Sequence, residues 1–518
     1  MAGQVLMVQG TASHVGKSVL VSALCRIFRQ DGFRVAPFKA QNMSNNSYVT
    51  VDGGEIGRAQ AVQADAAGVE ARVEMNPVLL KPEADHISQV VVMGHPLLTA
   101  KARDYFGLKP QLWEAVHTSL DALREDFDIV VAEGAGSPAE INLKKNEIVN
   151  MRVARYADAP VLLCGDIDRG GVFAFLVGTL ELLEPDEREL IKGFIINKFR
   201  GDPDLLTDGI TWLEERTGIP VAGLIHYYRD IHIPEEDSVA LDATSARTYQ
   251  PVLDVAVLQL PHIANFDDFD PLAHHPGVGL RYVDSPAELG RPDLVIIPGT
   301  KTTIPDLAWM NERGLSQAVK DLYTGGTAVI GICGGYQMLG IKVSDPEHIE
   351  SSIAELDGLG LLNLKTVFEG SKETHRINGK VIEANGLLAG ASGAPVRGYE
   401  IHMGRTSGEG FAPPFRIEDR ADAPVAGNGD LEGALDASGS VMGTYIHGLF
   451  QNGELRGAVL GELARRKGVS LPDAASEQDL DKEYDKLADW VRSSLDMDLV
   501  YRVSGLSRDY DAARVSNP

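Results

Sequence analysis

Short apolar runs alternate with amphipathic stretches along the first part of the chain. The runs are rich in β-branched residues, and a glycine or a polar residue follows each of them; they span 4–8, 127–132, 160–164 and 193–196. Runs of this kind, separated by helical stretches, predict strands buried on both faces of a parallel sheet. The carboxyl ends of such strands meet at one edge, where ligands bind. The pattern therefore predicts a doubly wound α/β domain.

The same alternation returns after a polar interruption. Hydrophobic periodicity lapses between residues 235 and 250, and apolar runs then recur at 253–258, 292–297 and 327–331. We therefore predict two doubly wound α/β domains, residues 1–235 and 252–518, joined by a linker at 236–251. Helical stretches at 455–466 and 484–495 are expected to be outer-layer helices of the second domain.

A glycine-rich turn follows the last of these apolar runs. The sequence Gly331-Ile332-Cys333-Gly334-Gly335 stands between a predicted strand and a helical stretch, as in a nucleophile elbow. The start of that helix would favour the thiolate form of Cys333 and offer the Gly334 N–H to an oxyanion. Gly299 ends the preceding predicted strand and is the candidate for the second oxyanion donor. The pattern predicts nucleophilic catalysis by Cys333, although a free cysteine can also be a plain core residue.

A cysteine nucleophile needs a base, and two histidines are candidates. His447 ends a β-rich run and precedes Gly448, which suits a ring presented at a strand end. His402 lies in a stretch whose alternation places it beside Glu400 on one face of a strand. That face is expected to meet the other domain or the substrate. We therefore expect the His447 ring to lie nearest the Cys333 sulfur.

The first predicted strand leads into a phosphate-binding loop. Residues Gly10–Ser18 connect it to an amphipathic helix, with one residue more between the glycines than the usual Walker A pattern. Backbone N–H groups of such a loop cradle phosphates, while Lys17 would reach the outer phosphates and Ser18 would ligate Mg²⁺. Glu133, at the end of the strand at 127–132, is a second candidate Mg²⁺ ligand. The predicted ATP-binding residues are Gly10, Thr11, Gly16, Lys17, Ser18 and Asn197.

A stretch crowded with amides and hydroxyls follows the phosphate-loop helix. It runs from Lys39 to Tyr48, and alone it would be read as a surface loop. Together with the phosphate loop it predicts a site for a large polar substrate. Asp52, just beyond it, is a further possible Mg²⁺ ligand; Asp166 is assigned to the substrate, although it and Asp168 could also bind metal or cap a helix. The predicted substrate-binding residues are Lys39, Gln41, Asn42, Asn46, Tyr48 and Asp166.

The overall charge and cysteine content narrow the class of protein. The net charge is −26 and the sequence pI is about 4.9, which argues against nucleic-acid or anionic-membrane binding. No apolar run reaches the roughly 18 to 20 residues needed to cross a bilayer. The three cysteines form no C-x-x-C pair, which argues against disulfides or a zinc site. We expect a cytoplasmic enzyme.

These motifs resemble those of known families. Gly331–Gly335 with His447 resembles a class I glutamine amidotransferase, and Gly10–Ser18 with Glu133–Gly136 resembles the dethiobiotin-synthetase-like ATP-dependent synthetases. Their fusion in this order, together with the Gln41–Tyr48 stretch, resembles the glutamine-dependent amidotransferases of the cobalamin pathway. Segments 165–171 and 399–404 carry the same resemblance.

The resemblance implies a reaction and its reagents. Glutamine would supply ammonia, and Mg-ATP would activate carboxylates of a corrinoid substrate. The Gln41–Tyr48 stretch implies the branch that amidates the b, d, e and g carboxylates of adenosylcobyrinic acid a,c-diamide. One departure stands out, because Leu449 occupies the place of the glutamate that orients the histidine in typical triads. The resemblance implies a reduced Cys–His pair, and Glu400 could orient a histidine instead.

Two other functions compete with this one. The phosphate loop could belong to a switch ATPase of the partitioning kind, with an inactive C-terminal module. The elbow could belong to a stand-alone cysteine hydrolase, which would leave Lys17 and Ser18 unexplained. Release of glutamate from glutamine, with and without ATP and a corrinoid, separates the three.

Overall fold

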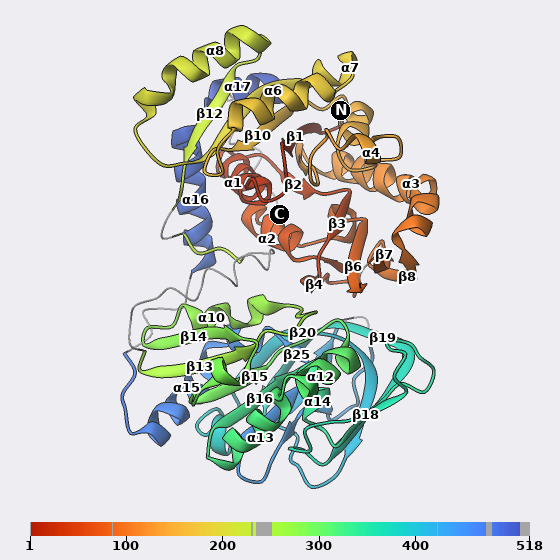
Figure 1. Ribbon diagram of the computed structural model, residues 1–518, viewed down its shortest axis with the longest axis vertical. Coiled ribbons are helices and arrows are strands. Elements are labelled where there is room, and N and C mark those ends of the chain that lie inside the picture. The colour runs from red at the N-terminus through yellow and green to blue at the C-terminus, as the bar shows by residue number, and fades with distance from the viewer. Residues whose placement is uncertain are drawn as a thin grey trace.

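The computed structural model describes residues 2–84, 86–228, 231–234, 251–421, 423–472 and 479–507. Two α/β bodies lie one above the other in Figure 1, and each is built around its own six-stranded sheet. The predicted fold class is confirmed. Of the expected linker 236–251, all but residue 251 lies outside the described residues, so that boundary stays a prediction.

The sheet of the first domain is parallel throughout, in the order β12-β11-β10-β1-β9-β2. Strand β1 lies inside the sheet and is buried on both faces: Val5 and Met7 enter one apolar core, and Leu6 and Val8 enter another. Two separate cores are what a doubly wound sheet requires. The strands are β1 (Gln4–Gly10), β2 (Val35–Phe38), β9 (Ile129–Glu133), β10 (Val161–Asp166), β11 (Ile191–Phe199) and β12 (Val221–His226).

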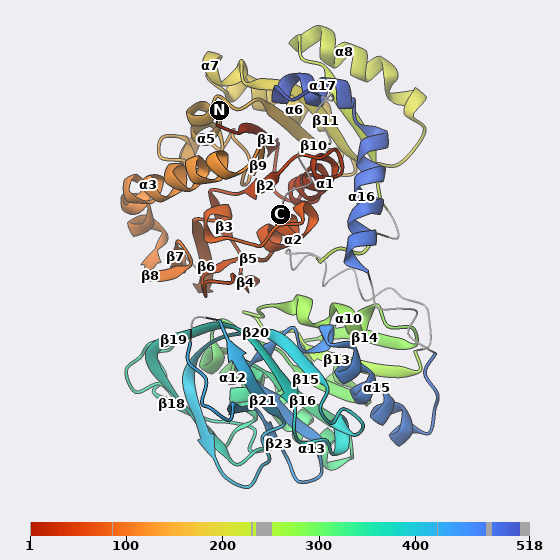
Figure 2. The same cartoon turned by 180° about the vertical axis from the view of Figure 1, so that it is seen from behind.

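Helices cover both faces of this sheet (Figures 1 and 2). They include α1, which begins at Lys17 directly after the phosphate loop. The helices are α1 (Lys17–Gln30), α2 (Arg58–Ala67), α3 (Ala102–Asp126), α4 (Ile141–Lys144), α5 (Met151–Ala157), α6 (Val172–Leu182), α7 (Pro185–Arg188) and α8 (Thr207–Thr217), with 3₁₀ turns η1 (Val73–Met75) and η2 (Pro203–Leu206).

The polar stretch at 39–48 contains two short strands. These are β3 (Gln41–Met43), which pairs with β6 (Val78–Ala84), and β4 (Ser47–Val49), which pairs with β5 (Glu55–Gly57). Strands β7 (Ile87–Val92) and β8 (His95–Lys101) extend the β3–β6 sheet. Figures 1 and 2 show these small sheets on the side of the first domain that faces the second.

The sheet of the second domain has the order β14-β13-β15-β16-β24-β23, with only β23 antiparallel. In register, Ile297 lies opposite Gly331, and Ile332 lies opposite Thr444. The segments after β15, β16 and β24 therefore emerge side by side at one sheet edge. The strands are β13 (Leu253–Leu258), β14 (Val278–Val283), β15 (Leu294–Ile297), β16 (Ala328–Ile332), β23 (Ala434–Leu435) and β24 (Val441–Thr444).

A second, mostly antiparallel sheet packs beside this one and was not predicted. Its long hairpin of β19 and β20 reaches the end of β24, because Tyr399 of β20 pairs with His447 of β25. It therefore forms one wall of the region around Cys333. The strands are β17 (Lys342–Ser344), β18 (Glu355–Asp357), β19 (Leu364–Val381), β20 (Pro395–Gly408), β21 (Phe415–Arg420), β22 (Asp430–Glu432) and β25 (Ile446–His447).

The helices of the second domain are mostly short. The one that follows Cys333, α14, is fully buried. The elements are η4 (Phe266–Phe269), α10 (Asp270–Ala273), α11 (Pro286–Leu289), α12 (Thr303–Glu312), α13 (Leu315–Thr324), α14 (Gly334–Leu339), η5 (Gly386–Leu388), η6 (Leu449–Gln451) and α15 (Gly453–Lys467). Nowhere in the described ranges is a helix both long and apolar enough to cross a membrane.

The last two helices depart from the expected domain division. Helices α16 (Leu480–Ser494) and α17 (Met497–Ser504) pack on the first domain, not the second (Figure 2). Leu487 and Val500 lie in the same core as Leu6 and Leu24. Periodicity predicts an apolar stripe on a helix but not the surface that covers it. The first domain is therefore built from both ends of the chain.

Candidate active site

Cys333 has the geometry expected of a nucleophile elbow. It links β16 to α14 with φ 52° and ψ −110°, which is unfavourable for a residue with a side chain. A Cβ on Gly335 would collide with the carbonyl oxygen of Ile297, so glycine is required there. The turn brings the thiol to the sheet edge, where its Sγ lies 3.3 Å from the carbonyl oxygen of Ile401.

His447 lies beside this thiol and is held by a carboxylate. Its Nδ1 is 2.7 Å from Oδ2 of Asp268, whose Oδ1 accepts a 2.7 Å hydrogen bond from the backbone N–H of Gly448. Burial alone would lower the pKa of His447, but the Asp268 charge and hydrogen bonds to Asp268 and Cys333 raise it to about 10. The arrangement is a buried Cys–His–Asp constellation.

Asp268 is a residue that the sequence did not reveal. It stands 179 residues before His447, on η4, and no motif marks it. Glu400, the alternative that the sequence suggested, instead pairs with Arg420 at 2.9 Å. Leu449, where typical triads have a glutamate, is buried in the apolar core. The orienting carboxylate is thus present but comes from another element.

His402 lines the same pocket in a different role. Its ring stacks on Tyr445 with 3.8 Å between centroids, and burial lowers its pKa to about 4. A ring that stays neutral and stacked is poorly suited to take and return the thiol proton. The expectation that His447 is the base stays a prediction, which the hydrogen bond to Cys333 favours.

Gly299 and Gly334 both lie close to Cys333. A Cβ on Gly299 would stand 3.0 Å from His447 Cε1 and 3.7 Å from Cys333 Cβ. A Cβ on Gly334 would stand 2.7 Å from Cγ2 of Thr300. The two predicted oxyanion residues are therefore neighbours of one another and of the nucleophile, and their donor role stays a prediction.

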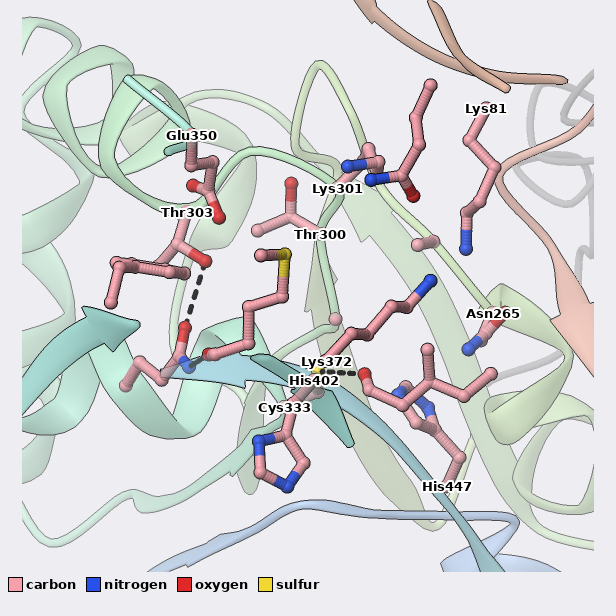
Figure 3. A pocket seen from close by; sticks show the side chains of 17 residues that line it. Lys81, Asn265, Thr300, Lys301, Thr303, Cys333, Glu350, Lys372, His402 and His447 are labelled. Atoms are coloured by element: carbon pink, nitrogen blue, oxygen red, sulfur yellow. Dashed lines mark hydrogen bonds between the residues drawn. The ribbon is translucent and has the colours of Figure 1, made fainter. Parts of the chain in front are cut away.

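A small pocket opens above Cys333, and residues of both domains line it (Figure 3). Lys81 and Gln89 come from the first domain, whereas Lys301, Glu350 and Lys372 come from the second. Lys81 and Lys372 both pair with the buried Glu55, and Lys301 pairs with Glu83 at 2.7 Å. Burial raises the pKa of Glu350 to about 8. Lysine side chains and a carboxyl group therefore line the pocket beyond the thiol.

A second site lies around the phosphate loop of the first domain. Lys17 Nζ donates to the carbonyl oxygens of Ala12 at 3.0 Å and Gly136 at 3.2 Å. Asn197 Nδ2 donates to Val15 O at 2.8 Å and lies against Gly16. The side chain of Asn197 therefore stabilises the phosphate loop through a hydrogen bond to its backbone. The sequence did not predict this contact.

Glu133 gathers polar partners at the start of α1. It accepts hydrogen bonds from Ser18 Oγ at 2.9 Å, Lys39 Nζ at 2.8 Å and Gln63 Nε2 at 2.6 Å. Burial would raise the pKa of Glu133, yet Lys39 and Gln63 hold it below its ordinary value. Oxygen donors from a hydroxyl and an ionised carboxylate are those that Mg²⁺ prefers. The Ser18–Glu133 pair therefore fits the predicted metal.

Asp52, the remaining predicted metal ligand, lies apart from that pair. Asp52 is exposed in the β4–β5 turn and accepts a hydrogen bond from Thr50, and no described contact joins it to Ser18 or Glu133. Within the described ranges, no group of three or more His, Cys, Asp or Glu residues could hold a metal ion. The metal role of Asp52 stays a prediction.

The predicted substrate residues divide between two places. Gln41 accepts a hydrogen bond from Tyr105, and Asn42 donates to Gln60 at 3.0 Å, all within the first domain. Asn46 and Tyr48 instead contact the second domain. Asn46 Oδ1 accepts from Phe266 N at 3.3 Å, and Tyr48 OH accepts from Arg376 at 2.8 Å.

Asp166 is engaged close to the phosphate loop. Its carboxylate pairs with Lys198 Nζ at 2.9 Å and accepts a hydrogen bond from Asp168 N. Lys198 also donates to the carbonyl oxygen of His14 at 2.6 Å. The substrate role assigned to Asp166 stays a prediction.

Comparison with known proteins gives matches for both domains. Residues 6–239 match the model of the CobQ/CobB/MinD/ParA nucleotide binding domain, and residues 254–455 match the CobB/CobQ-like glutamine amidotransferase domain. Cobyric acid synthase from Dehalococcoides mccartyi is 54% identical over 96% of this chain and 98% of its own. Cobyric acid synthase from Pelotomaculum thermopropionicum is 52% identical over 97% of this chain and 96% of its own. The enzyme of the same name from Sorangium cellulosum is 51% identical over 98% of this chain and 100% of its own.

Proposed function

This chain belongs to the cobyric acid synthase family, and we propose on that premise that it amidates a corrinoid with glutamine and ATP. The finer assignment is amidation of the b, d, e and g carboxylates of adenosylcobyrinic acid a,c-diamide to give adenosylcobyric acid. The observation that carries the proposal is a Cys–His–Asp constellation joined, in one chain, to a phosphate loop. A switch ATPase does not need the Cys–His–Asp constellation, and a cysteine hydrolase does not need the phosphate loop.

The second domain releases ammonia from glutamine. The Cys333 sulfur attacks the side-chain amide carbon, and the C–N bond breaks as His447 passes a proton to the leaving ammonia. Water then attacks the thioester carbon, gives a proton to His447, and the C–S bond breaks to release glutamate. Backbone N–H groups at Gly334 and Gly299 stabilise the oxyanion in both steps. Asp268 holds the His447 ring in the orientation that both transfers need.

The charges beyond the thiol bind the amino-acid end of glutamine. Glu350 accepts hydrogen bonds from the α-ammonium, and Lys301 with Lys372 faces the α-carboxylate. A carboxyl whose pKa burial raises gains most from a cationic partner. The pocket therefore selects a zwitterion and not a simple amide.

The first domain activates the acceptor carboxylate. A carboxylate oxygen of the corrinoid attacks the γ-phosphorus of ATP, the bond to ADP breaks, and an acyl phosphate forms. Ammonia then attacks the acyl carbon and phosphate leaves, which gives the amide. Lys17 and the backbone of the phosphate loop hold the phosphates, and Ser18 with Glu133 holds Mg²⁺, which neutralises phosphate charge when bound.

The remaining assignments follow from this chemistry. Asn197 supports the phosphate loop of the ATP site, and Gln41 and Asn42 with Asp166 contact the corrinoid. We place the enzyme in the cytoplasm, where ATP and glutamine are both supplied. Its strongly negative charge fits partners that are small molecules and not nucleic acids or membranes.

Replacement of the nucleophile tests whether the second domain releases ammonia while the first domain carries out the amidation. Cys333→Ser is expected to abolish amidation with glutamine and to retain amidation with concentrated ammonium chloride, each followed by mass spectrometry of the corrinoid. Glutamate release should disappear in the same variant. Equal loss with both nitrogen sources would overturn the proposal, and so would a wild-type enzyme that releases no glutamate.

A further inference from the structure

The segment that carries Asp268 is held by the other domain. Ser47 N donates to Oδ1 of Asn265 at 2.8 Å, and Phe266 N donates to Oδ1 of Asn46 at 3.3 Å. The guanidinium of Arg58, on α2, lies 3.0 Å from Oδ2 of Asp267. Of the three residues before Asp268, Asn265 and Phe266 are therefore hydrogen-bonded to the first domain, and Asp267 is ion-paired with it.

The Arg58–Asp267 ion pair is buried and lies next to the catalytic carboxylate. Side-chain exposure is 9% for Arg58 and 1% for Asp267, and Asp268 is 1% exposed. Burial raises the pKa of Asp267, the neighbouring charge of Asp268 adds to this, and Arg58 opposes it. Two adjacent buried carboxyl groups are each stabilised best when each has its own cationic partner. His447 serves Asp268, and Arg58 serves Asp267.

Loss of the Arg58 charge would change the position of His447. An uncompensated Asp267 would take up a proton or turn towards water, and either change would move η4, a 3₁₀ segment of four residues. Asp268 lies in the same segment and makes both hydrogen bonds that fix His447 and Gly448. A base displaced by as little as about 1 Å can slow a reaction about 100-fold.

We propose that Arg58 of the synthetase domain is a positioning residue for the glutaminase, acting through Asp267 and Asp268 on His447. The proposal rests on the proposed function, because it assigns His447 as the base. On this proposal, the glutaminase is fully active only when the synthetase domain is docked, because Arg58 follows the Gln41–Tyr48 stretch of that domain. Asn46 and Ser47, in that stretch, hold the same segment.

The test compares three full-length variants by glutamate release. Arg58→Met is expected to lower kcat for glutamine hydrolysis by about 10- to 100-fold, with KM for glutamine changed by less than about 3-fold. Arg58→Met combined with Asp267→Asn is expected to recover most of that loss, because a neutral amide needs no cation. Arg376→Met, which breaks another ion pair across the same interface, to Glu70, is the matched control and should retain wild-type kcat.

Amidation with ammonium chloride and thermal unfolding of each variant accompany the kinetics. In Arg58→Met, the rate of ammonia-dependent amidation and the unfolding temperature should both match those of the wild type, which would show that the synthetase domain is intact. The proposal is overturned if Arg376→Met loses as much glutaminase as Arg58→Met, or if the double variant is no better than Arg58→Met. It is also overturned if Arg58→Met keeps wild-type kcat, or loses ammonia-dependent amidation along with glutaminase. A wild-type enzyme without glutaminase would instead refute the proposed function.

Discussion

His447 receives its carboxylate from a distant part of the chain, and this has a consequence for pH. The Asp268 contact raises the pKa of the folded imidazole to about 10, above the ordinary value of about 6.5. The pair therefore stabilises the fold fully below about pH 6.5, and that contribution is lost as the pH rises through about 10.

Asp268→Asn tests this contact. We expect the variant to unfold at a lower temperature than the wild type at pH 6 to 7, with the difference shrinking as the pH approaches 10. Glutaminase kcat should fall by on the order of 10³-fold, because the ring loses its orienting carboxylate. Melting curves across that pH range measure the first effect and glutamate release the second. A stability difference that grew towards pH 10 would contradict the assignment.

Glu350 carries a prediction about substrate selectivity. Glutaramate has the side-chain amide of glutamine but lacks the α-ammonium that Glu350 is proposed to bind. The wild type should prefer glutamine, and Glu350→Gln should raise KM for glutamine about 10- to 100-fold and erase most of the preference. Glu347→Gln, exposed on the same loop, is the control and should leave the preference intact. An unchanged preference in Glu350→Gln would place the α-ammonium elsewhere.

Among the elements, the phosphate loop between β1 and α1 carries a prediction that separates the two reactions. Lys17→Ala is expected to lower amidation on the order of 100-fold or more with either nitrogen source, because both need the acyl phosphate. Glutamate release should persist, since the thiol lies in the other domain. Lys192→Ala, exposed on β11, is the control. Normal amidation from ammonium in Lys17→Ala would exclude the loop from phosphate transfer.

Elements were predictable where a local pattern specifies them. The strand–turn–helix units at Gly10–Ser18 and Gly331–Gly335 carry glycines at positions that geometry demands, so motif and structure coincide. The β19–β20 hairpin has no such marker, because buried and exposed positions do not alternate regularly along β20.

Long-range contacts set the limit of prediction from sequence. Asp268 has no local signature, since its partner His447 lies 179 residues away. Asn46 and Tyr48 are predicted to bind substrate because they are polar, and that role stays a prediction; the contacts they make across the domain interface could not be foreseen from the sequence. Polar residues at a buried interface and at a ligand site look alike in a sequence.

At the scale of the whole molecule, α16 ties the C-terminal part of the chain to the first domain. Leu487 is 1% exposed in the core that contains β1 and α1. Leu487→Ala should lower the stability of that domain by about 2 to 5 kcal/mol.

Heating distinguishes which domain this change weakens. After brief heating, ammonia-dependent amidation should be lost at a lower temperature in Leu487→Ala than in the wild type. Glutaminase should fall over the same lower temperature range in Leu487→Ala, because Arg58 of the first domain is proposed to position Asp268 for the glutaminase. Leu480→Ala, on an exposed turn of the same helix, is the control. If glutaminase alone were weakened, α16 would have to support the second domain in solution.

The return of α16 and α17 to the first domain also orders events during synthesis. The ribosome delivers β1 and α1 first, but the helices that cover them, 480–504, come after the whole glutaminase fold. A nascent or truncated chain that ends inside the second domain leaves part of the first core exposed to water. The core of the ATP-binding domain is therefore completed only after the whole ammonia-releasing domain has been synthesised.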